Sequence, residues 1–340
     1  MKQWVVENTD GFDGLRLKEV AIPKVGDSDV LVKLNAASLN YRDLLIPRGE
    51  YPLPIHLPVV PGSDAAGEVV DVGPNVSRFK KGDRVVTLFN QGHQYGAIDI
   101  RATQTGLGGS IDGILREYAV FDATGLVKVP KNLSDIESST LSCAALTSWN
   151  ALYGLEPLKP GQVVLVQGTG GVSIFALQFA KVAGAIVIAT TSSASKAERL
   201  KQLGADHVIN YKEDPNWGET ARNLTPDGAG VDFVIEVGGP GTLAQSFKAI
   251  KFEGIINVIG IVGDGEGKAQ PPALDTLSHI CTVRGVQVGS RALMEDMIQA
   301  IEANDIHPIV DEKVFALDQA RDAYDHLWNQ NHFGKVVIQI

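Results

Sequence analysis

The sequence contains very little cysteine, with only Cys143 and Cys281 among 340 residues. Two cysteines cannot build the disulfide framework of a small secreted domain, and their scarcity indicates a reducing compartment, so we expect a cytoplasmic protein. Long apolar runs are also absent, because no stretch approaches the roughly 18 apolar residues that a membrane-spanning helix needs. The first residues, Met1 to Glu7, lack the apolar core of a secretory signal. We therefore expect a protein that is neither exported by that route nor embedded in a membrane.

Basic residues are in the minority, with 30 Lys and Arg against 40 Asp and Glu and a formal charge of -10. The average field of such a chain repels phosphate backbones and anionic membrane surfaces. We therefore expect no nucleic-acid partner and no membrane partner. A local basic patch could still bind one small anion, because net charge describes the far field and not an individual pocket. The expected partner is a small-molecule substrate.

The chain is longer than one ordinary core of about 100 to 150 residues and suits two domains that share a cleft. Hydrophobic residues make up 44% and charged residues 21% of the chain, so it can bury a sizeable core instead of staying disordered.

The first third of the chain has short apolar segments interrupted by glycine and proline, which is typical of strands joined by turns. We expect strands at Val30–Leu34, Ala66–Val72, Arg84–Leu88 and Tyr118–Phe121. The segment from Asn90 to Gly113 is rich in Gly, Gln and Thr without a clear period, which predicts an exposed loop of functional length. This region should form a β-rich, barrel-like domain.

From Pro160 onward, strand patterns alternate with helix patterns. Strands are expected at Gln162–Gln167, Ile186–Thr191, His207–Tyr211, Val231–Val237, Gly254–Val262 and Thr282–Val288. Helices are expected at Val172–Val182, Lys196–Leu203, Leu243–Ile250 and Leu293–Ala303. This alternation predicts a doubly wound, mostly parallel α/β sheet.

The end of the chain returns to short-strand character and finishes in Lys335-Val336-Val337-Ile338-Gln339-Ile340. We therefore expect a discontinuous first domain, made of residues 1–130 and completed by 306–340. Residues 131–305 should form the doubly wound domain.

The strand at Val163 to Gln167 runs into Gly168-Thr169-Gly170-Gly171-Val172-Ser173 and then into a helix pattern. The pyrophosphate of a dinucleotide requires this arrangement. Gly168 makes the tight turn, Gly170 lets the backbone approach the phosphates, and the helix N-terminus offers free N–H groups. Ser173 stands where a third glycine is usual, and its hydroxyl could cap the helix or contact phosphate. A degenerate motif alone is as often an ordinary turn, but the strand before it and the helix after it favour a dinucleotide site.

The choice of cofactor depends on the end of the second predicted strand, where an NAD enzyme carries an acid for the ribose 2′-hydroxyl. Here the chain reads Thr190-Thr191-Ser192-Ser193-Ala194-Ser195-Lys196, without an acid. Hydroxyl donors and an ammonium group suit a 2′-phosphate, so Ser192, Ser193 and Lys196 predict NADP. The alternative interpretation is that a serine caps the next helix and Lys196 is a solvated surface charge.

Several motifs in this order resemble one known family across essentially the whole chain. The motifs are Ser38-Leu39-Asn40-Tyr41-Arg42-Asp43, Val60-Pro61-Gly62-Ser63-Asp64-Ala65-Ala66-Gly67-Glu68-Val69, Lys81-Gly82-Asp83-Arg84-Val85, Leu146-Thr147-Ser148-Trp149-Asn150-Ala151-Leu152, the glycine turn and Gly334-Lys335-Val336-Val337. They resemble the medium-chain dehydrogenase/reductase superfamily, specifically its zinc-independent quinone oxidoreductase-like branch and the neighbouring zinc alcohol dehydrogenase-like proteins. The resemblance implies a GroES-like β-barrel catalytic domain, a Rossmann domain with the cofactor in the cleft, and a homodimer joined through the last Rossmann strand.

The resemblance also implies roles for individual residues. Lys196 and Tyr211 are similar to a pair that holds the 2′-phosphate, with Gly171 and Val172 on the pyrophosphate. Positions that resemble the nicotinamide lining are Asn40, Thr147, Val237, Gly238, Ile259, Gly260, Gly289 and Ser290. For Tyr211 the alternative is an aromatic residue that packs at a strand end.

The departures from the family concern zinc. Zinc alcohol dehydrogenases of this superfamily have a Cys where Asn40 stands, His-Glu where Ser63-Asp64 stands, and a third ligand where Cys143 stands. A catalytic zinc needs about three N, O or S ligands, and one thiol beside a neutral Asn and Ser cannot supply them. The seven histidines show no metal-ligand spacing; they are His56, His93, His207, His279, His307, His326 and His332. We therefore predict no metal site, with Cys143 a small buried residue.

Without a Lewis acid an unactivated alcohol is hard to oxidise, whereas quinones and conjugated enones need only alignment and a few hydrogen-bond donors. The candidate catalytic residues are Asn40, Tyr41 and Thr147. Asn40 could supply an amide donor, Tyr41 or Tyr95 a hydroxyl and Arg42 a charge, and the sequence does not choose among them. Asn40 and Tyr41 could equally be structural turn residues.

These observations predict an NADPH-dependent, zinc-independent oxidoreductase that transfers hydride to a quinone or an α,β-unsaturated carbonyl. Two alternatives stay open at this point. One is an alcohol dehydrogenase-like enzyme with an unrecognised zinc site, and the other is a non-catalytic NADPH-binding protein, since fold does not fix function.

Overall fold

The computed structural model describes residues 1–260 and 270–340 of the chain. Their contacts divide them into two compact units, Met1–Leu146 with Ser290–Ile340 (unit 1) and Thr147–Gly289 (unit 2). The ranges expected from the sequence differ from these units, because residues 131–146 and 290–305 pack with unit 1. Contacts with the N-terminal strands and loops show why: the N–H of Arg291 donates to the carbonyl of His93, and Arg84 forms an ion pair with Asp135 at 2.5 Å.

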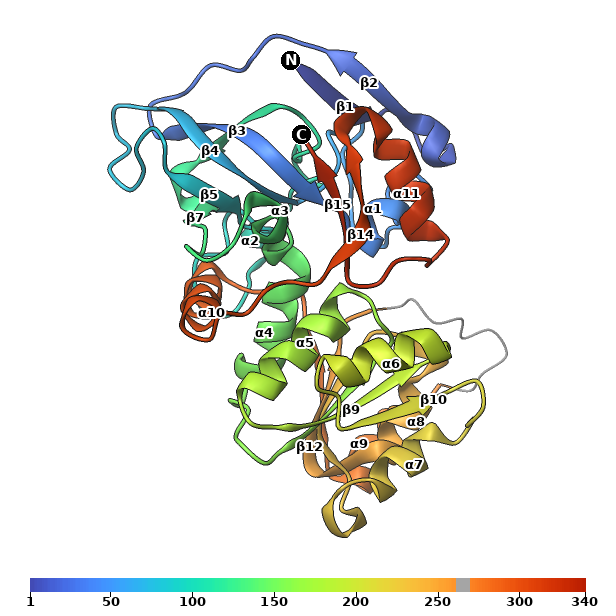
Figure 1. Cartoon of the computed structure of the whole chain (residues 1–340). Helices are drawn as coiled ribbons and strands as arrows, with labels where there is room; N and C mark the ends of the chain where they lie inside the picture. Colours follow the sequence, from blue (N-terminus) through green and yellow to red (C-terminus); the bar gives the residue numbers. More distant parts are fainter. Residues whose placement is uncertain (261–269) are drawn as a thin grey trace. The chain divides into compact units, whose positions relative to one another are not determined.

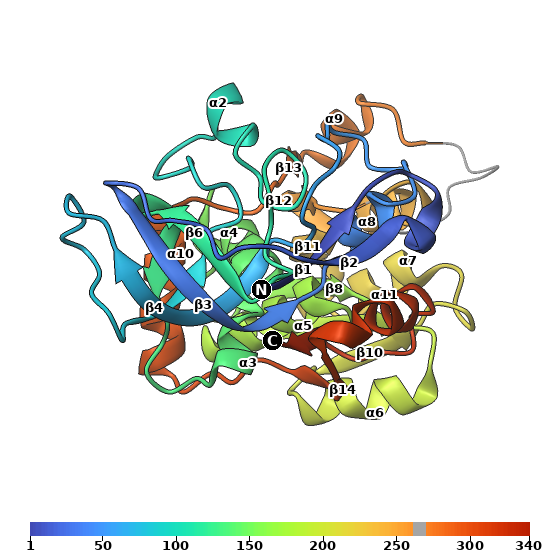
Figure 2. The same ribbon diagram turned by 90° about the horizontal axis from the view of Figure 1, so that it is seen from above.

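Unit 1 contains a mainly antiparallel sheet, and its long strands β3 and β4 run side by side in Figure 2. Its strand order within the described residues is β14-β15-β3-β4-β5-β7, with β6 also paired to β3. The strands are β3 Asp29–Ser38, β4 Asp64–Val72, β5 Arg84–Thr87, β6 Tyr118–Asp122, β7 Leu126–Lys128, β14 Val310–Ala316 and β15 Lys335–Gln339. β1 (Lys2–Val6) and β2 (Leu15–Glu19) form a separate antiparallel pair. Alternate residues of β3, from Val30 to Ala36, are buried, as expected for a half-exposed sheet.

The C-terminal segment returns to unit 1 as the sequence suggests. β15 pairs antiparallel with β3, which places Ile338 opposite Ala37, and parallel with β14. Both strands help to close the core around Tyr324 and Phe315. The helices of this unit are α1 Tyr41–Leu45, α2 Ile100–Thr103, α3 Asp135–Ser138, α10 Arg291–Ala303 and α11 Ala320–Trp328.

Unit 2 is a doubly wound sheet, which confirms the predicted fold class. Its strands are β8 Val163–Gln167, β9 Ile186–Thr191, β10 His207–Asn210, β11 Val231–Glu236, β12 Ile250–Val258 and β13 Thr282–Gly285. All neighbours pair in parallel in the order β10-β9-β8-β11-β12-β13. The order reverses between β8 and β11, and ligands of such sheets bind outside the carboxyl ends of the strands at this point.

The helices of unit 2 are α4 Leu146–Tyr153, which begins one residue before the unit boundary, α5 Gly171–Val182, α6 Ala194–Gln202, α7 Trp217–Asn223, α8 Leu243–Ala249 and α9 Asp275–His279. In Figure 1, α5 and α6 cover one face of the sheet over β8 to β10, whereas α7 and α8 lie together on the other face. The predicted strand Gly254–Val262 is shifted, since β12 begins at Ile250 and Ile261 and Val262 lie outside the described residues.

The segment Asn90–Gly113 is only partly the exposed loop that its composition suggested. It contains the short helix α2, and Asn90 and Leu107 are 0% and 1% exposed. Leu107 packs in the core of unit 1, and its carbonyl accepts a 2.7 Å hydrogen bond from Arg42. Other residues of the segment are strongly exposed, with Tyr95 at 80% and Ile100 at 78%. The loop therefore belongs to the wall of the barrel-like unit.

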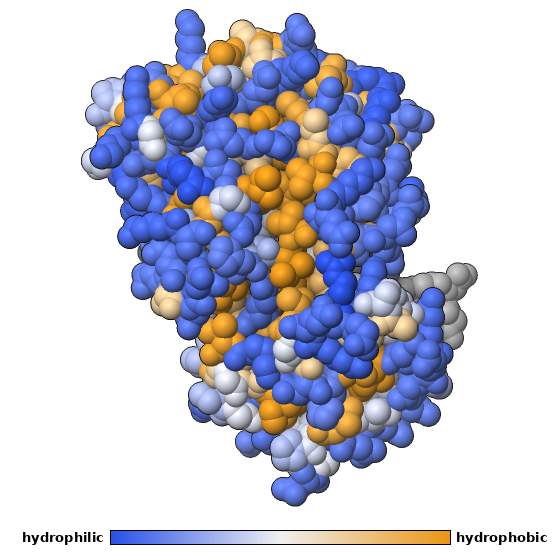
Figure 3. All heavy atoms as spheres, viewed as in Figure 1, coloured by the Kyte–Doolittle hydropathy of each residue, from blue (hydrophilic) through white to orange (hydrophobic). Residues whose placement is uncertain are grey.

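The visible surface is mostly hydrophilic with apolar patches between polar side chains (Figure 3). Within the described residues, no helix is both long enough and apolar enough to cross a membrane.

Candidate functional site

The glycine turn joins β8 to α5 at the carboxyl edge of the sheet in unit 2. Gly168 has a φ of +75°, the left-handed conformation that a glycine adopts without steric cost. Gly170 is the N-cap of the twelve-residue helix α5 and makes no side-chain cap. A Cβ atom at either glycine would have open space around it, so the backbone is accessible to a ligand. The first N–H groups of α5 lack partners within the helix and suit an anion such as a pyrophosphate.

The side chains around the turn stabilise it from within. The hydroxyl of Ser173, which is 1% exposed, donates a 2.5 Å hydrogen bond to the carbonyl of Gln167. This differs from the expectation that Ser173 caps the helix or contacts phosphate, since Gly170 occupies the N-cap and the serine closes the strand-to-turn corner. Thr169 is also buried, and Gly171 and Val172 are the first residues of α5.

The end of β9 brings the predicted 2′-phosphate residues to the same edge of the sheet. Ser193 is the N-cap of α6, and its hydroxyl accepts from the N–H of Lys196 at 3.4 Å, so the capping interpretation holds for this serine. Ser192 precedes the cap, and Lys196 lies in the first turn of α6. The N–H of Tyr211 donates to the carbonyl of Thr191 at 3.1 Å, so Tyr211 follows β10 directly beside the end of β9. Its side chain is 42% exposed.

Glu236 is a fully buried carboxylate at the end of β11, and its interactions organise the next loop. Its Oε1 accepts from the N–H groups of Gly238 at 2.9 Å and Gly239 at 2.8 Å and from the hydroxyl of Thr242. Its Oε2 accepts from Gln167 Nε2 at 2.7 Å and from the hydroxyl of Ser246. The loop that carries Val237 and Gly238 is therefore tied to the residue immediately before Gly168.

The other predicted nicotinamide positions of unit 2 adjoin the same network. The N–H groups of Ile259 and Gly260 both approach the carbonyl of Glu236, at 2.8 and 3.3 Å. A Cβ atom on Gly260 would lie 2.4 Å from the carbonyl oxygen of Val237, so only glycine fits this close approach. The structure thus brings the loops after β8, β11 and β12 together.

Three predicted positions lie at the boundary between the units. Thr147 is 3% exposed in the first turn of α4, and Gly289 is the buried last residue of unit 2. Ser290 begins unit 1, where its hydroxyl accepts from the N–H of Leu293 at 3.3 Å and caps α10. The side chain of Ser290 therefore has a structural role in addition to the predicted one.

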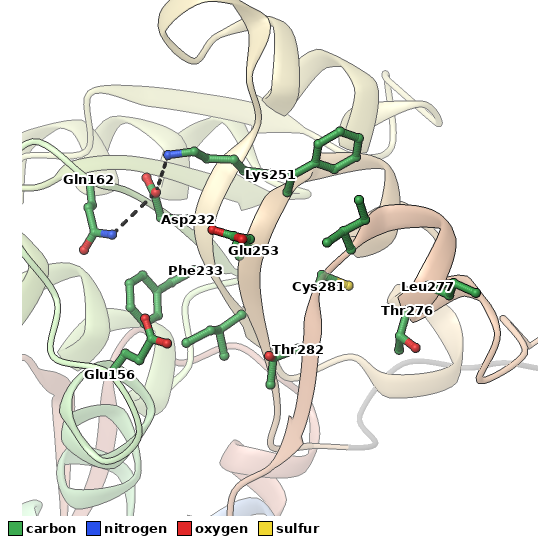
Figure 4. A pocket seen from close by; sticks show the side chains of 14 residues that line it. Glu156, Gln162, Asp232, Phe233, Lys251, Glu253, Thr276, Leu277, Cys281 and Thr282 are labelled. Carbon is green, nitrogen blue, oxygen red and sulfur yellow. Dashed lines mark hydrogen bonds and ion pairs between the residues drawn. The ribbon is translucent and has the colours of Figure 1, made fainter.

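A hollow of about 830 Å³ opens at the opposite edge of the sheet in unit 2 (Figure 4). Gln162, Asp232, Lys251 and Thr282 line it, and these residues stand at the amino ends of β8, β11, β12 and β13. Lys251 pairs with Asp232 at 2.9 Å. Because dinucleotides bind beyond the carboxyl ends of such strands, this hollow is not the cofactor site.

In unit 1, Asn40 is held by a buried lysine from the C-terminal strand. The ammonium of Lys335, 3% exposed, donates to Asn40 Oδ1 at 2.5 Å and to the carbonyl of Leu39 at 2.8 Å. Asn40 Nδ2 lies 3.5 Å from the hydroxyl of Ser63. Asn40 directly precedes α1, and its own N–H donates to the carboxylate of Asp43 at 2.8 Å.

Asp64 and Cys143 complete this polar group. Asp64 is fully buried and accepts from the hydroxyl of Ser63 at 2.6 Å and from the N–H of Cys143 at 3.1 Å. Its Oδ2 lies 3.6 Å from the ammonium of Lys335. Desolvation and the Asp64 carboxylate raise the pKa of the Cys143 thiol to about 12, so this thiol is neutral at physiological pH.

The other proposed donors of unit 1 are Arg42, Tyr41 and Tyr95. The guanidinium of Arg42 lies over the rings of Tyr51 and Phe89, at 5.0 and 4.8 Å from their centroids, besides its bond to Leu107. Tyr41 packs against the core, and desolvation followed by the charge of Glu50 raises the pKa of its hydroxyl. Tyr95 is 80% exposed. Asn40 and Arg42 are thus the candidates whose side chains are held by other polar groups.

Comparison with known proteins identifies the family. The model of the alcohol dehydrogenase GroES-like domain matches residues 26–131, and that of zinc-binding dehydrogenases matches residues 171–303. A zinc-type alcohol dehydrogenase-like protein of Schizosaccharomyces pombe is 50% identical, with 99% of this chain and 98% of that protein covered. The chain belongs to the medium-chain dehydrogenase/reductase superfamily.

Two further relatives of this superfamily are informative. A 2-methylene-furan-3-one reductase of Solanum lycopersicum is 32% identical, over 99% of this chain and 79% of that protein. The crystal structure of an NAD-dependent alcohol dehydrogenase matches with a TM-score of 0.89 and 32% identity, and the match covers 100% of both chains. The protein is thus an oxidoreductase of a pyridine-nucleotide family, and the glycine turn with its open backbone fits such a cofactor.

The positions that match the zinc ligands of some superfamily members carry mostly other side chains in this chain. The side chains at the matching positions are the amide of Asn40, the hydroxyl of Ser63, the carboxylate of Asp64 and a neutral thiol, and Asn40 Oδ1 already accepts from an ammonium group. Among the residues that the structure describes, no group of three His, Cys, Asp or Glu side chains could hold a metal. A catalytic zinc requires about three such ligands.

Sequence reasoning missed Glu236, Gln167 and the role of Lys335. The sequence contains one feature that could have identified Glu236: it is an acid at the end of an apolar strand, just before a glycine-rich turn. Lys335 lies in a motif that contributed to the family resemblance, but nothing in the local sequence connects it with Asn40.

Proposed function

We propose that this protein is an NADPH-dependent, zinc-independent oxidoreductase that transfers hydride to a quinone or an α,β-unsaturated carbonyl compound. The observation that carries the proposal is the polar group around Asn40, where a neutral amide held by a lysine stands in the position of a metal ligand. Such a site offers hydrogen-bond donors and no Lewis acid.

The preference for NADPH is supported by the end of β9. Where an NAD enzyme has an acid for the 2′-hydroxyl, this chain has Ser192 and, in the first turn of α6, Lys196. Tyr211 follows the neighbouring strand β10. An ammonium group and hydroxyls favour a 2′-phosphate, and a carboxylate would repel it. Bound NADPH would supply the hydride, with its pyrophosphate at Gly168 to Val172.

Conjugated acceptors match the donors that the chain offers. Hydride addition at the β-carbon of an enone places negative charge on the carbonyl oxygen, and a proton then gives the saturated product. A positioned N–H group stabilises that oxygen, whereas removing hydride from an alcohol needs prior loss of the hydroxyl proton. We assign the N–H role to Asn40 Nδ2 and keep Tyr41 and Thr147 as further candidates.

The test is the loss of NADPH absorbance with a quinone, a cyclic enone and an aldehyde, before and after prolonged chelation, with zinc measured by elemental analysis. We expect turnover with the first two acceptors, unchanged by chelation, and a zinc content near zero. Turnover abolished by chelation, with one zinc per chain, would instead support the alcohol dehydrogenase that some relatives' names suggest. Tight NADPH binding without turnover on a wide panel would indicate a non-catalytic binding protein.

We also propose that the protein forms a homodimer through β13. This strand lies at the edge of the sheet, with β12 as its partner within the described residues, and edge strands offer unpaired backbone groups to a second copy. Exposed apolar side chains gather beside it; they are Phe252, Leu274, Leu277, Ile280 and Val283. Such a patch on an edge is characteristic of an interaction surface.

The state of the cysteines favours a cytoplasmic location. Both cysteines are free thiols, and a reducing compartment would keep them so. Cell fractionation with a compartment marker would test this location, and recovery with secreted proteins would contradict it.

A further inference from the structure

The ammonium of Lys335 lies closer to the side chain of Asn40 than to the carboxylate of Asp64. Its two hydrogen bonds go to Asn40 Oδ1 and to the carbonyl of Leu39, at 2.5 and 2.8 Å, whereas Asp64 Oδ2 lies 3.6 Å away. Asp64 has its own donors in Ser63 and the N–H of Cys143. The lysine is therefore placed to act on the amide, with Asp64 balancing its charge.

This contact fixes the orientation of the Asn40 amide, with Oδ1 facing Lys335 and Nδ2 facing away from it. An amide can rotate by half a turn about its last bond and exchange its oxygen for its NH₂ group. A lysine ammonium carries only donors, so the exchanged orientation would set NH₂ against NH₃⁺ and lose a charge-assisted hydrogen bond. The orientation with Nδ2 directed away from Lys335 is thus fixed, and among the residues that the structure describes this nitrogen makes a long contact, at 3.5 Å, to Ser63.

We propose that Lys335 is a positioning residue that keeps Asn40 Nδ2 available as the donor to the oxygen of the acceptor. The inference rests on the proposed function, because it presumes that Asn40 is that donor. Besides fixing the orientation, an ammonium on Oδ1 withdraws electron density from the amide and makes its N–H groups better donors, as in other chains of hydrogen bonds. The buried positive charge thereby acts on the acceptor through the amide.

The first test removes the lysine together with its counter-charge. Lys335→Met alone leaves Asp64 buried without a compensating cation and is expected to unfold at a lower temperature. The double variant K335M/D64N removes both charges and should recover most of the unfolding temperature. It should bind NADPH with an unchanged Kd and show a KM within about threefold of wild type, while kcat with an enone falls about 10-fold to 100-fold. Lys335→Arg, which keeps a cationic donor, should restore part of kcat.

The second test asks whether the effect passes through Asn40. In an Asn40→Ala background, adding K335M/D64N should change kcat by less than about threefold, because the donor that Lys335 positions is already gone. A matched control removes an exposed pair from unit 2, Lys248 and Glu219, 2.9 Å apart, as K248M/E219Q, and should leave kcat and KM unchanged.

The outcomes separate this inference from the proposed function. A kcat at the wild-type level in a folded K335M/D64N variant overturns the positioning role. The role is also overturned if K335M/D64N lowers kcat by the same factor in the wild-type and in the Asn40→Ala background. An absence of NADPH-dependent turnover in the wild type with every quinone and enone overturns the proposed function itself. Normal kcat in Asn40→Ala, with turnover intact, rejects Asn40 as the donor and therefore the inference as well.

Discussion

Gln167 at the end of β8 donates a 2.7 Å hydrogen bond from Nε2 to Oε2 of Glu236 at the end of β11. These two strands are neighbours at the point where the strand order reverses. The bond joins the residue before the glycine turn to the residue before the Val237-Gly238 loop, so the two loops that we propose bind the cofactor share one buried anchor. The same carboxylate accepts two backbone N–H groups of the second loop.

Replacing this anchor should therefore affect cofactor binding as well as stability. Glu236→Gln puts an NH₂ group where the carboxylate accepts from several donors, which costs about 1 to 3 kcal/mol of unfolding free energy. We expect a lower thermal midpoint and a Kd for NADPH raised about 10-fold, measured by calorimetry. The exposed Glu219→Gln is the control and should change neither. An unchanged Kd in a folded Glu236→Gln variant would contradict the anchor role.

The two glycines of the turn should respond differently to alanine. Gly170 has φ -76° and ψ 171° and open space for a Cβ, so Gly170→Ala should fold with a loss below about 1 kcal/mol. Its methyl group would point to the side from which phosphates approach, and Kd for NADPH should rise at least about 10-fold. Gly168→Ala should cost about 1 to 2 kcal/mol because its φ is +75°.

Gly161 supplies the matched control for this pair. It has a φ of +82° with open space for a Cβ, but it lies in the turn before β8, at the other edge of the sheet. Gly161→Ala should lose as much stability as Gly168→Ala while NADPH binding, measured by calorimetry, stays at the wild-type level. Equal effects of all three substitutions on the Kd for NADPH would contradict the assignment of the glycine turn to the cofactor site.

Cofactor preference should reverse when the charge beside the ribose is reversed. In S192D/K196A a carboxylate replaces a hydroxyl and an ammonium group is lost, so the ratio of kcat/KM for NADPH to that for NADH should fall about 100-fold. Lys201→Ala removes a lysine from the last turn of the same helix, where it pairs with Glu198 at 2.8 Å, and should leave the ratio unchanged. An unaltered ratio in S192D/K196A would reject the 2′-phosphate assignment.

The regular elements were predictable because their signals are local. β9 occupies Ile186–Thr191 as expected, and α5 begins one residue before the predicted start. A short apolar run bounded by turn residues and a helix period after a glycine turn both lie within a few residues of sequence. The doubly wound, mostly parallel sheet then followed from the alternation of strands and helices.

The contacts of the candidate site were not predictable because they join distant residues. Lys335 and Asn40 are 295 positions apart, and Gln167 and Glu236 are 69 apart. Lys335 reaches Asn40 only because the last strand pairs with β3. The burial of Leu107 was missed for a similar reason, since its carbonyl and side chain are held by residues from other segments.

A single substitution on the edge strand should separate the proposed dimer. Val283, 38% exposed on β13, becomes a lysine in Val283→Lys, and a charge on an edge strand opposes pairing with a second copy. Light scattering should give the mass of two chains for the wild type and of one chain for the variant, with NADPH binding retained. Val182→Lys, at an exposed apolar position on α5, should remain dimeric. A monomeric wild type would contradict the proposal.

The stability of unit 1 should depend on pH because of the buried carboxyl group of Asp43. This carboxyl is fully buried, and desolvation raises its pKa from 3.8 to about 6, although Arg42 at 3.6 Å and the N–H of Asn40 act in the opposite direction. The folded state therefore binds a proton more readily than the unfolded state between these values. The raised pKa of Asp43 therefore adds to the free energy of unfolding. This contribution has its full size below about pH 3.8 and is lost as the pH rises through about 6.

Comparison with Asp43→Asn isolates this effect from the other carboxyl groups. The free energy of unfolding of the wild type, minus that of the variant, should fall by on the order of 2 kcal/mol between about pH 4.5 and 7.5, measured by urea denaturation. Asp311 is the control of opposite sign. Despite desolvation, the N–H groups of Phe333 and Lys313 and the ring of His326 lower its pKa, so the difference for Asp311→Asn should rise with pH. A difference that rises with pH for Asp43→Asn as well would mean that the ion pair with Arg42 outweighs the cost of burial.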